Sequence, residues 1–301
     1  MRTREFIREL DRLTAMVTTP PLVKKLGRVA NGPSRESLYL GTVLPKPSSQ
    51  SHAELAVFFE KVRSGVIDKL GGADWLKKVP AHDPLRCSIG LFETIDLSFR
   101  ETAHTRMLAW LMDPSKEHGF GDVLVSVFLQ KVFRLKSRPR LKEVVIRSEV
   151  ITSDQKGRLD IHLGGKWSAT DRASTRWEVI LEAKIHADEG DEQCSRYETE
   201  VQVRRDSYSE RVLVFLTPDG RSPATNSINA DRPWESLSFL DLLTLFRPEL
   251  AALTERPGFY MIRHYMAGVL KNFYRINCGE NQAALEGSNI YQISDYLSPA
   301  T

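Results

Sequence analysis

Two short segments near the middle of the chain carry charged side chains among aliphatic ones. Asp160 lies in "RLDIHL" (158–163), and Glu182 and Lys184 lie in "VILEAKI" (179–185). A buried charge is unfavourable unless it is paired or bound to a metal. We therefore ask what these three charges hold.

The alternation of side chains along a β-strand groups these charges on one face. In the first segment, Asp160 and His162 point away from the face that their aliphatic neighbours share. In the second segment, Glu182 and Lys184 share a face. If the two segments are neighbouring strands, Asp160 and Glu182 lie on the polar side of both.

Two converging carboxylates suit a divalent cation. Without a partner they repel each other, and one of them is forced to take up a proton. Hard oxygen ligands of this kind favour Mg²⁺ or Mn²⁺. A lysine beside them, here Lys184, can stabilise phosphate charge and hold an attacking water. The pattern indicates a divalent-metal site with a cation beside it.

A second acid-x-Lys triplet shows that spacing alone is weak. Asp154-Gln155-Lys156 falls in "TSDQKG", which reads as a turn with polar flanks. Both charges are expected to be solvated there. Glu182 and Lys184 differ because apolar residues flank them and an acidic strand precedes them.

The hydrophobic periodicity predicts the elements that position these residues. Period-two patterns predict four strands, at 143–152, 158–163, 176–185 and 211–218, with a turn after the first and a loop at 164–175. Helical periodicity predicts helices at 100–114, 193–204, 238–246 and 259–276, and one more that follows a Gly-containing turn within 118–133. This order favours an α/β fold with a mixed sheet of four to five strands flanked by helices.

At this point the chain resembles a known family. Asp160, followed on the next strand by Glu182 and Lys184, resembles the D…(D/E)xK signature of the PD-(D/E)XK nuclease superfamily. "RETAHTRMLAWLMDP…HGFGD" resembles the leading helices of one bacterial branch, in which an early Glu, here Glu101, points into the site. The resemblance extends over residues 91–218.

The segment after the lysine adds to the resemblance. "HADEGDEQCSRY" is similar to the Q-x-x-x-Y motif of that branch, which gives Gln193 and Tyr197. Two positions depart from the family pattern: Leu159 replaces the nominal Pro before the Asp, and Cys194 replaces an aliphatic residue.

The resemblance implies a role for each matched residue. Asp160 and Glu182 would bind Mg²⁺ or Mn²⁺, and Glu101 would complete the metal shell. Lys184 would position the attacking water. Gln193 and Tyr197 would hold substrate or orient the active-site strand. The family implies a restriction-endonuclease-like fold and a nuclease that acts on DNA, in a setting of bacterial defence against phage.

The remainder of the chain is divided by composition. Helical patterns at 3–17 and 53–70, separated by a segment rich in Pro, Gly and Ser, predict a helical N-terminal extension over 1–85. Residues 86–301 then form the nuclease-like domain. The extension could contact a partner protein, and nucleases of this fold often act as homodimers.

Bulk properties exclude some classes. The chain has 301 residues, 41% apolar content and a net charge of +3. No apolar run reaches eighteen residues and the N-terminus lacks an apolar secretory region, so we expect no membrane span and a cytosolic location. The three cysteines are too dispersed for a disulfide framework.

A local basic run lies before the first predicted strand. "RLKSRPRLKEVVIR" contains Arg138, Arg140 and Lys142, which are candidates for contacting nucleic-acid phosphates. Such runs are most often a solvated face. The run becomes a phosphate-binding patch only if a nuclease site lies nearby.

Structural alternatives exist for each site residue. Asp160 and Glu182 could pair with Arg158 or Arg147, and Glu101 could simply favour a helix N-terminus. Lys184 could reach solvent from a strand end. The histidines His104, His118 and His162 and the aromatic Tyr197 could be core residues.

The class of function has two rivals. The first is an inactive nuclease fold that binds nucleic acid or protein, and the intact acidic residues and lysine argue against it. The second is a structural scaffold with salt-bridged carboxylates, which predicts that magnesium does not stabilise the protein.

Overall fold

The computed structural model describes residues 74–298 except 156, 171–172, 186–192, 204–207, 225–233, 282–284 and 286, together with 57, 61 and 63–72. The chain divides into two compact units, 1–73 and 74–301. In the first unit, residues 63–70 are helical, within the helix expected over 53–70. The helix expected over 3–17 lies outside the described residues.

The second unit contains a five-stranded mixed sheet with the strand order β1-β2-β3-β4-β5. Strands β1, β2 and β3 form an antiparallel meander, and β4 and β5 continue it in parallel. The strands are β1 (Arg140–Ile151), β2 (Arg158–Thr170), β3 (Ala173–Ala183), β4 (Glu210–Thr217) and β5 (Glu235–Ser238). This sheet confirms the predicted fold class.

The loop predicted at 164–175 is wrong, because most of this segment extends β2 and β3. The two strands pair from Ile161 with Leu181 to Thr170 with Ala173. The rings of Trp167 and Trp177 stack at a centroid distance of 5.9 Å across this extension. Packing of these aromatic residues outweighs the Gly-rich, polar composition that favoured a loop.

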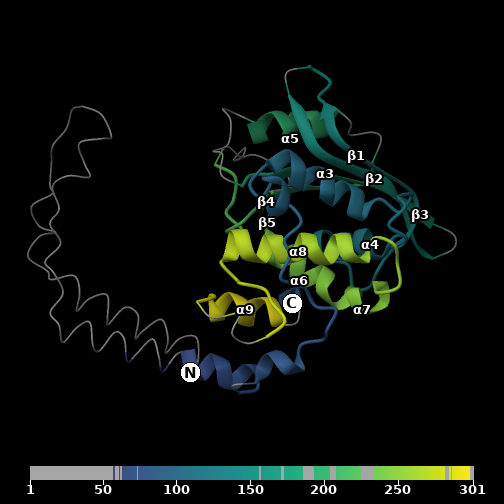
Figure 1. Ribbon diagram of the computed structural model, residues 1–301. Coiled ribbons are helices and arrows are strands. Elements are labelled where there is room, and N and C mark those ends of the chain that lie inside the picture. The colour runs from purple at the N-terminus through teal and green to yellow at the C-terminus, as the bar shows by residue number, and fades with distance from the viewer. Residues whose placement is uncertain are drawn as a thin grey trace, which may run out of the picture. The chain divides into compact units, whose positions relative to one another are not determined.

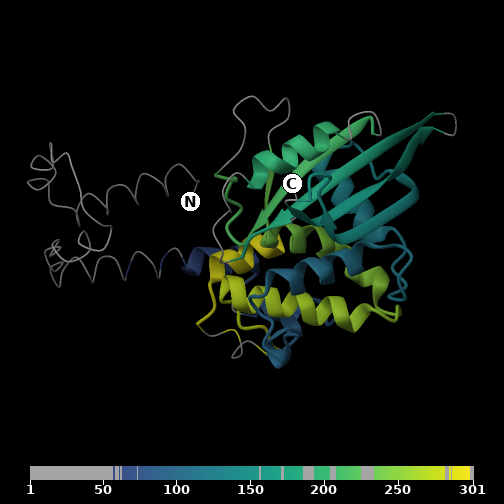
Figure 2. The same ribbon diagram turned by 90° about the horizontal axis from the view of Figure 1, so that it is seen from above.

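Helices lie on both faces of the sheet (Figures 1 and 2). Helix α5 (Gln193–Val203) lies on one face. Helices α3 (Glu101–Met112), α4 (Val123–Val132), α6 (Phe239–Phe246) and α8 (Phe259–Tyr274) lie on the other. These helices follow the sequence prediction within a few residues, and α4 begins at Val123, after the predicted Gly-containing turn.

The remaining elements are short. Sequence periodicity did not indicate β5 or the last helix, α9 (Ile290–Leu297). The others are α7 (Leu250–Leu253) and four 3₁₀ helices, η3 (Trp75–Lys78), η4 (Pro84–Arg86), η5 (Glu93–Ile95) and η7 (Arg247–Glu249). No helix in the described part of the chain is long and apolar enough to cross a membrane.

Residues 74–85 pack within the second unit. Arg247 Nε donates a hydrogen bond of 2.7 Å to Asp83 Oδ2, and Leu85 is fully buried. The structure therefore divides the chain twelve residues before the expected limit of the N-terminal extension, 85/86.

Candidate active site

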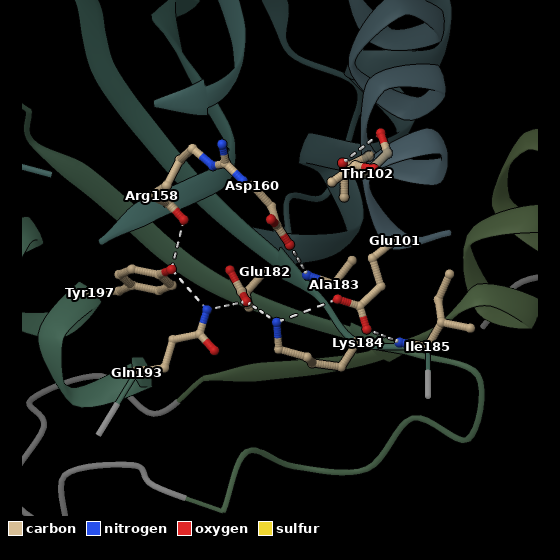
Figure 3. Close-up of polar contacts among 11 residues, drawn as sticks. Glu101, Thr102, Arg158, Asp160, Glu182, Ala183, Lys184, Ile185, Gln193 and Tyr197 are labelled. Atoms are coloured by element: carbon tan, nitrogen blue, oxygen red, sulfur yellow. Dashed lines mark hydrogen bonds and ion pairs between the residues drawn. The ribbon is translucent and has the colours of Figure 1, made fainter. Parts of the chain in front are cut away.

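Asp160 and Glu182 lie opposite each other on adjacent antiparallel strands. Ile161 pairs with Leu181, and the next step of that register joins Asp160 and Glu182. The Ala183 N–H donates a hydrogen bond of 2.9 Å to Asp160 Oδ2 (Figure 3). The two carboxylates therefore converge where β2 starts and β3 ends, on the face that strand alternation predicts.

Glu182 is fully buried and holds two donors on one oxygen. Lys184 Nζ and Gln193 Nε2 each donate a hydrogen bond of 2.6 Å to Glu182 Oε1. The other oxygen, Oε2, is buried and has no hydrogen-bond partner among the described residues. An unbonded carboxylate oxygen in the interior is costly and favours a ligand that the protein itself does not supply.

Lys184 and Glu101 approach the same point from different elements. Lys184 follows the last residue of β3, and its N–H donates to Leu216 O on β4 at 2.9 Å. Glu101 begins α3, and its Oε1 accepts a 3.0 Å hydrogen bond from Ile185 N. Lys184 Nζ lies 3.7 Å from Glu101 Oε2. Glu101 therefore contacts the site rather than only its own helix.

Gln193 and Tyr197 lie one turn apart on α5 and face the carboxylates (Figure 3). Gln193 Nε2 also donates to Tyr197 Oη at 2.9 Å, and Tyr197 Oη donates to Arg158 O at 2.7 Å. The Tyr197 ring packs in the cluster that contains Ile180 and Phe215. Tyr197 is thus a core aromatic residue whose hydroxyl links α5 to the start of β2.

Burial and mutual repulsion raise the pKa values of both carboxyls. Burial raises the pKa of Asp160 to about 6, with the charges of Glu101 and Glu149 adding to it and the Ala183 N–H and Lys184 opposing it. Burial raises the pKa of Glu182 to about 8, with Asp160 adding to it and Lys184 opposing it. Ionising both carboxyls at neutral pH therefore requires additional positive charge.

The lysine remains charged in this environment. Burial lowers the pKa of Lys184, but the Glu182 carboxylate at 2.6 Å more than offsets that effect and raises the pKa above its ordinary value. Asp160 and Glu101 add to the increase. Lys184 is thus an ammonium donor, not a general base.

The donor set fits a hard divalent cation through two atoms. Glu182 Oε2 and Asp160 Oδ1 have no bond within the described residues, and both belong to carboxylates that repel each other. Among the described residues, no group of three or more His, Cys, Asp or Glu side chains is arranged to hold a metal. Glu101 is engaged by the Ile185 amide.

Sequence reasoning missed Glu149. Val150 pairs with Leu159 and Ser148 pairs with Ile161, which places Glu149 opposite Asp160. The row Glu149, Asp160 and Glu182 crosses three strands. Alternation along 143–152, applied as it was to β2 and β3, would have found it.

Glu149 is itself constrained. Arg158 Nε lies 2.6 Å from Glu149 Oε2, while Glu149 Oε1 is buried without a hydrogen bond among the described residues. Its backbone has a positive φ of 61°, which is uncommon for a residue with a side chain. Arg158 therefore pairs with Glu149, and no salt bridge within the described part joins Arg158 or Arg147 to Asp160 or Glu182.

The basic run lies away from the carboxylates. Arg140 pairs with Ser168 at the far end of β1, whereas Ile151 pairs with Arg158 near Asp160. Arg138 NH1 donates a 2.9 Å hydrogen bond to Glu249. Lys142 is exposed on β1.

Three histidines have structural partners. His104 is buried, with Nε2 2.9 Å from Ser98 O and Nδ1 3.1 Å from Tyr265 Oη, and burial lowers its pKa to about 4. His118 Nε2 lies 2.9 Å from Asp113 O. His162 Nε2 lies 2.8 Å from Glu178 Oε1, two residues along β2 from Asp160.

A mixed sheet with antiparallel β1–β3, parallel β4 and converging Asp160, Glu182 and Lys184 defines a restriction-endonuclease-like protein. Residues 89–266, more than half of the chain, match the family model described as the PD-(D/E)XK nuclease superfamily. The chain therefore belongs to that superfamily. No curated protein and no solved structure matches the chain significantly.

Proposed function

We propose that the protein is a magnesium-dependent nuclease that hydrolyses phosphodiester bonds in DNA. The observation that carries this proposal is the unbonded, buried Oε2 of Glu182, which lies on a carboxylate adjacent to Asp160 and bonded to Lys184. Membership of a nuclease superfamily supports the reaction class. Mn²⁺ is expected to replace Mg²⁺.

The side chains suggest a division of labour. Asp160 and Glu182 would hold the cation, which when bound polarises a phosphate oxygen and acidifies a water. Lys184 would donate a hydrogen bond to the attacking water and stabilise negative charge on the phosphate. Glu101 would complete the metal shell, and its contacts with Lys184 Nζ and Ile185 N would also orient Lys184 and the end of β3.

Gln193 and Tyr197 act through the carboxylate in this proposal. Gln193 fixes Oε1 of Glu182, which leaves Oε2 for the cation. Tyr197 holds Gln193 and the Arg158 carbonyl. Both are positioning residues.

The biological setting is part of the proposal. The family's setting supports a role in defence against phage or foreign DNA, in the cytosol. A homodimer and a partner protein bound by the N-terminal extension remain parts of this proposal. Arg138, Arg140 and Lys142 are proposed to contact DNA phosphates.

The test is cleavage of plasmid, single-stranded DNA and RNA with Mg²⁺ or Mn²⁺. We expect cleavage by the parent protein, and a loss of at least about 100-fold in Asp160→Asn and in Lys184→Ala. Asp154→Asn is the matched control, because Asp154 belongs to the second acid-x-Lys triplet and accepts a hydrogen bond from Thr152 in the turn after β1. That variant should cleave like the parent.

Thermal unfolding separates the rivals. Mg²⁺ should raise the Tm of the parent and of Asp154→Asn but not of Asp160→Asn, because a ligand that binds only the folded state stabilises it. A metal-dependent Tm without cleavage would favour the inactive nucleic-acid-binding module. No effect of Mg²⁺ on either quantity would favour the structural scaffold.

A further inference from the structure

The sheet face that carries the carboxylates ends in a row of cations. Lys142 pairs with Lys166 on β2, and Lys166 pairs with Arg176 on β3. Directly paired residues project from the same side of the sheet. Three positive side chains therefore lie side by side across three adjacent strands.

This row and the acidic row share one face. Along β2, Asp160, His162, Gly164 and Lys166 alternate onto the same side, because pairing with β3 shows no bulge between residues 161 and 168. A bulge in β1 between Lys142 and Val145 keeps Lys142 on that side as well. The acidic row around Asp160 and the cationic row around Lys166 therefore lie on one face of the sheet, and we call the surface between them the strip.

Placing like charges directly opposite each other destabilises a sheet. Glu143 neutralises one member of the row, because its Oε2 lies 2.6 Å from Lys166 Nζ. Lys142, Arg147 and Arg176 are exposed, and within the part of the chain that the structure describes none of them has an ion pair. The uncompensated positive charge indicates a site for an anion.

A cavity of about 290 Å³ lies on this face, and its lining includes Glu143 but not Lys142. Arg147, Lys166 and Arg176 line it together with His162 and Tyr208. Gly164 lies in its floor, where an added Cβ would meet Tyr208 Oη at 3.3 Å. The glycine therefore lets the Tyr208 ring approach the sheet and close one side of the cavity.

A buried pair fixes the floor of the cavity. Glu178 is 1% exposed, and its Oε1 lies 2.8 Å from His162 Nε2 while its Oε2 lies 3.5 Å from Arg211 Nε. These contacts hold the imidazole in one orientation on the strip. The cavity is therefore a formed site rather than a set of independent surface lysines and arginines.

The distance between the two rows suits a polymer. Lys166 lies six residues along β2 from Asp160, roughly 20 Å at about 3.3 Å per residue. Successive phosphates of a duplex strand are about 3.4 Å apart along the axis, so roughly six phosphates span the strip. Arg147, which pairs with His162, lies between the two rows.

Helix α5 leaves this strip accessible. Its residues Cys194 and Tyr197 pack with Ile180 of β3 and Leu213 of β4. The cavity lies beside that contact, over β1, β2 and the start of β3. The described residues of α5 thus pack beside the cavity, which lies along β2 from the carboxylates.

We propose that Lys142, Arg147, Lys166 and Arg176 form a phosphate-binding groove that holds the nucleic-acid backbone on one side of the scissile bond. The inference rests on the proposed function for its substrate class. It assigns contacts to phosphates, not to bases, so the groove contributes affinity without sequence preference. Lys142 is the member of the basic run that belongs to this groove, whereas Arg138 pairs with Glu249.

The test is the binding of a labelled 20-base-pair duplex without divalent metal, measured by fluorescence anisotropy across a salt series. The variants are Lys142→Gln with Arg176→Gln, and Arg147→Gln alone. The control pair, Arg106→Gln with Arg256→Gln, removes the same charge from exposed positions on α3 and before α8.

We expect the groove double variant to bind about tenfold more weakly and its salt slope to fall by about two, because each lost phosphate contact removes about 0.9 from the slope. Its Tm without DNA should not fall, since like-charge repulsion is relieved. Unchanged affinity and slope would overturn the groove. A loss of affinity in the control pair as large as that in the groove double variant would also overturn it.

Two further results keep this inference separate from the nuclease proposal. If the parent protein binds the duplex through the groove but does not cleave DNA with Mg²⁺ or Mn²⁺, only the catalytic proposal is refuted. Tighter binding of ATP than of the duplex, lost in the groove variants, would overturn the polymer assignment in favour of a small phosphorylated ligand.

Discussion

Gln193 Nε2 donates hydrogen bonds to two acceptors at once, Glu182 Oε1 at 2.6 Å and Tyr197 Oη at 2.9 Å. One amide thereby connects the carboxylate on β3 with α5. Because Lys184 binds the same Oε1, the carboxylate is held in one rotamer with Oε2 unbonded.

Replacing Gln193 should therefore weaken both metal binding and packing. In Gln193→Ala, Glu182 loses one of two donors, and we expect cleavage to fall about tenfold, and the free energy of unfolding to fall by about 1–3 kcal/mol. The measurements are kcat with Mg²⁺ and urea denaturation. Tyr197→Phe is the control, because the ring stays while the 2.7 Å hydrogen bond to Arg158 O is lost.

That control has its own expected result. Tyr197→Phe should lower the free energy of unfolding by about 1 kcal/mol and change Mg²⁺ affinity less than Gln193→Ala does. Equal effects of both variants on metal affinity would show that Gln193 acts only as part of the core.

Magnesium binding should strengthen with pH between about 6 and 8. The pKa of Asp160 is about 6 and that of Glu182 is about 8, so each must lose a proton to bind a cation. Calorimetric titrations at pH 6 and pH 8 should show tighter binding at pH 8, and the observed binding heat should vary with the ionisation enthalpy of the buffer because protons are released. Affinity independent of pH would exclude these carboxyls as ligands.

Stability without metal should change in the opposite direction. Both folded-state pKa values exceed the ordinary ones, so the folded state binds more protons than the unfolded chain from about pH 4 to pH 8. Its free energy of unfolding should fall across that range, by up to about 1.4 kcal/mol per pH unit for each carboxyl. Asp160→Asn in EDTA should flatten this profile in urea titrations.

Glu149 should affect the site through charge. It contributes to the raised pKa of Asp160, so Glu149→Gln should lower that pKa and strengthen Mg²⁺ binding at pH 6. Isothermal titration of the variant at pH 6 tests this expectation. Weaker Mg²⁺ binding would instead indicate that Glu149 is itself a ligand. Its buried Oε1, which has no hydrogen bond among the described residues, would then bind the cation, and the substitution would remove that ligand.

Two substitutions of Lys184 separate the effect of its positive charge from the effect of its shape. Its contact with Glu182 balances a buried carboxylate, so Lys184→Met should raise the pKa of Glu182 further and abolish cleavage at neutral pH. Lys184→Arg keeps the charge and should retain part of the Mg²⁺-induced increase in Tm. A Lys184→Met variant that cleaves like the parent would remove the lysine from the mechanism.

Alternation along strands was enough to predict the strand faces of Asp160 and Glu182, because each carboxylate interrupts an aliphatic strand. It did not reveal that β2 and β3 extend through 164–175, since that pairing depends on Trp167 stacking on Trp177. The row of Lys142, Lys166 and Arg176 was equally hidden. Their pairing depends on register, which local periodicity does not determine.

The bulge in β1 determines the charge of the far end of the strip. Between Val145 and Lys142, β1 advances three residues while β2 advances two. With a regular register, Glu143 would lie opposite Lys166, and Lys142 would turn toward the side of Trp167. Losing the bulge with the sequence unchanged would thus exchange a base for an acid without any substitution, whereas deleting one of its residues would keep Lys142 opposite Lys166. The irregularity of this strand, rather than its composition, therefore sets the sign of the charge that the strip presents to a polyanion.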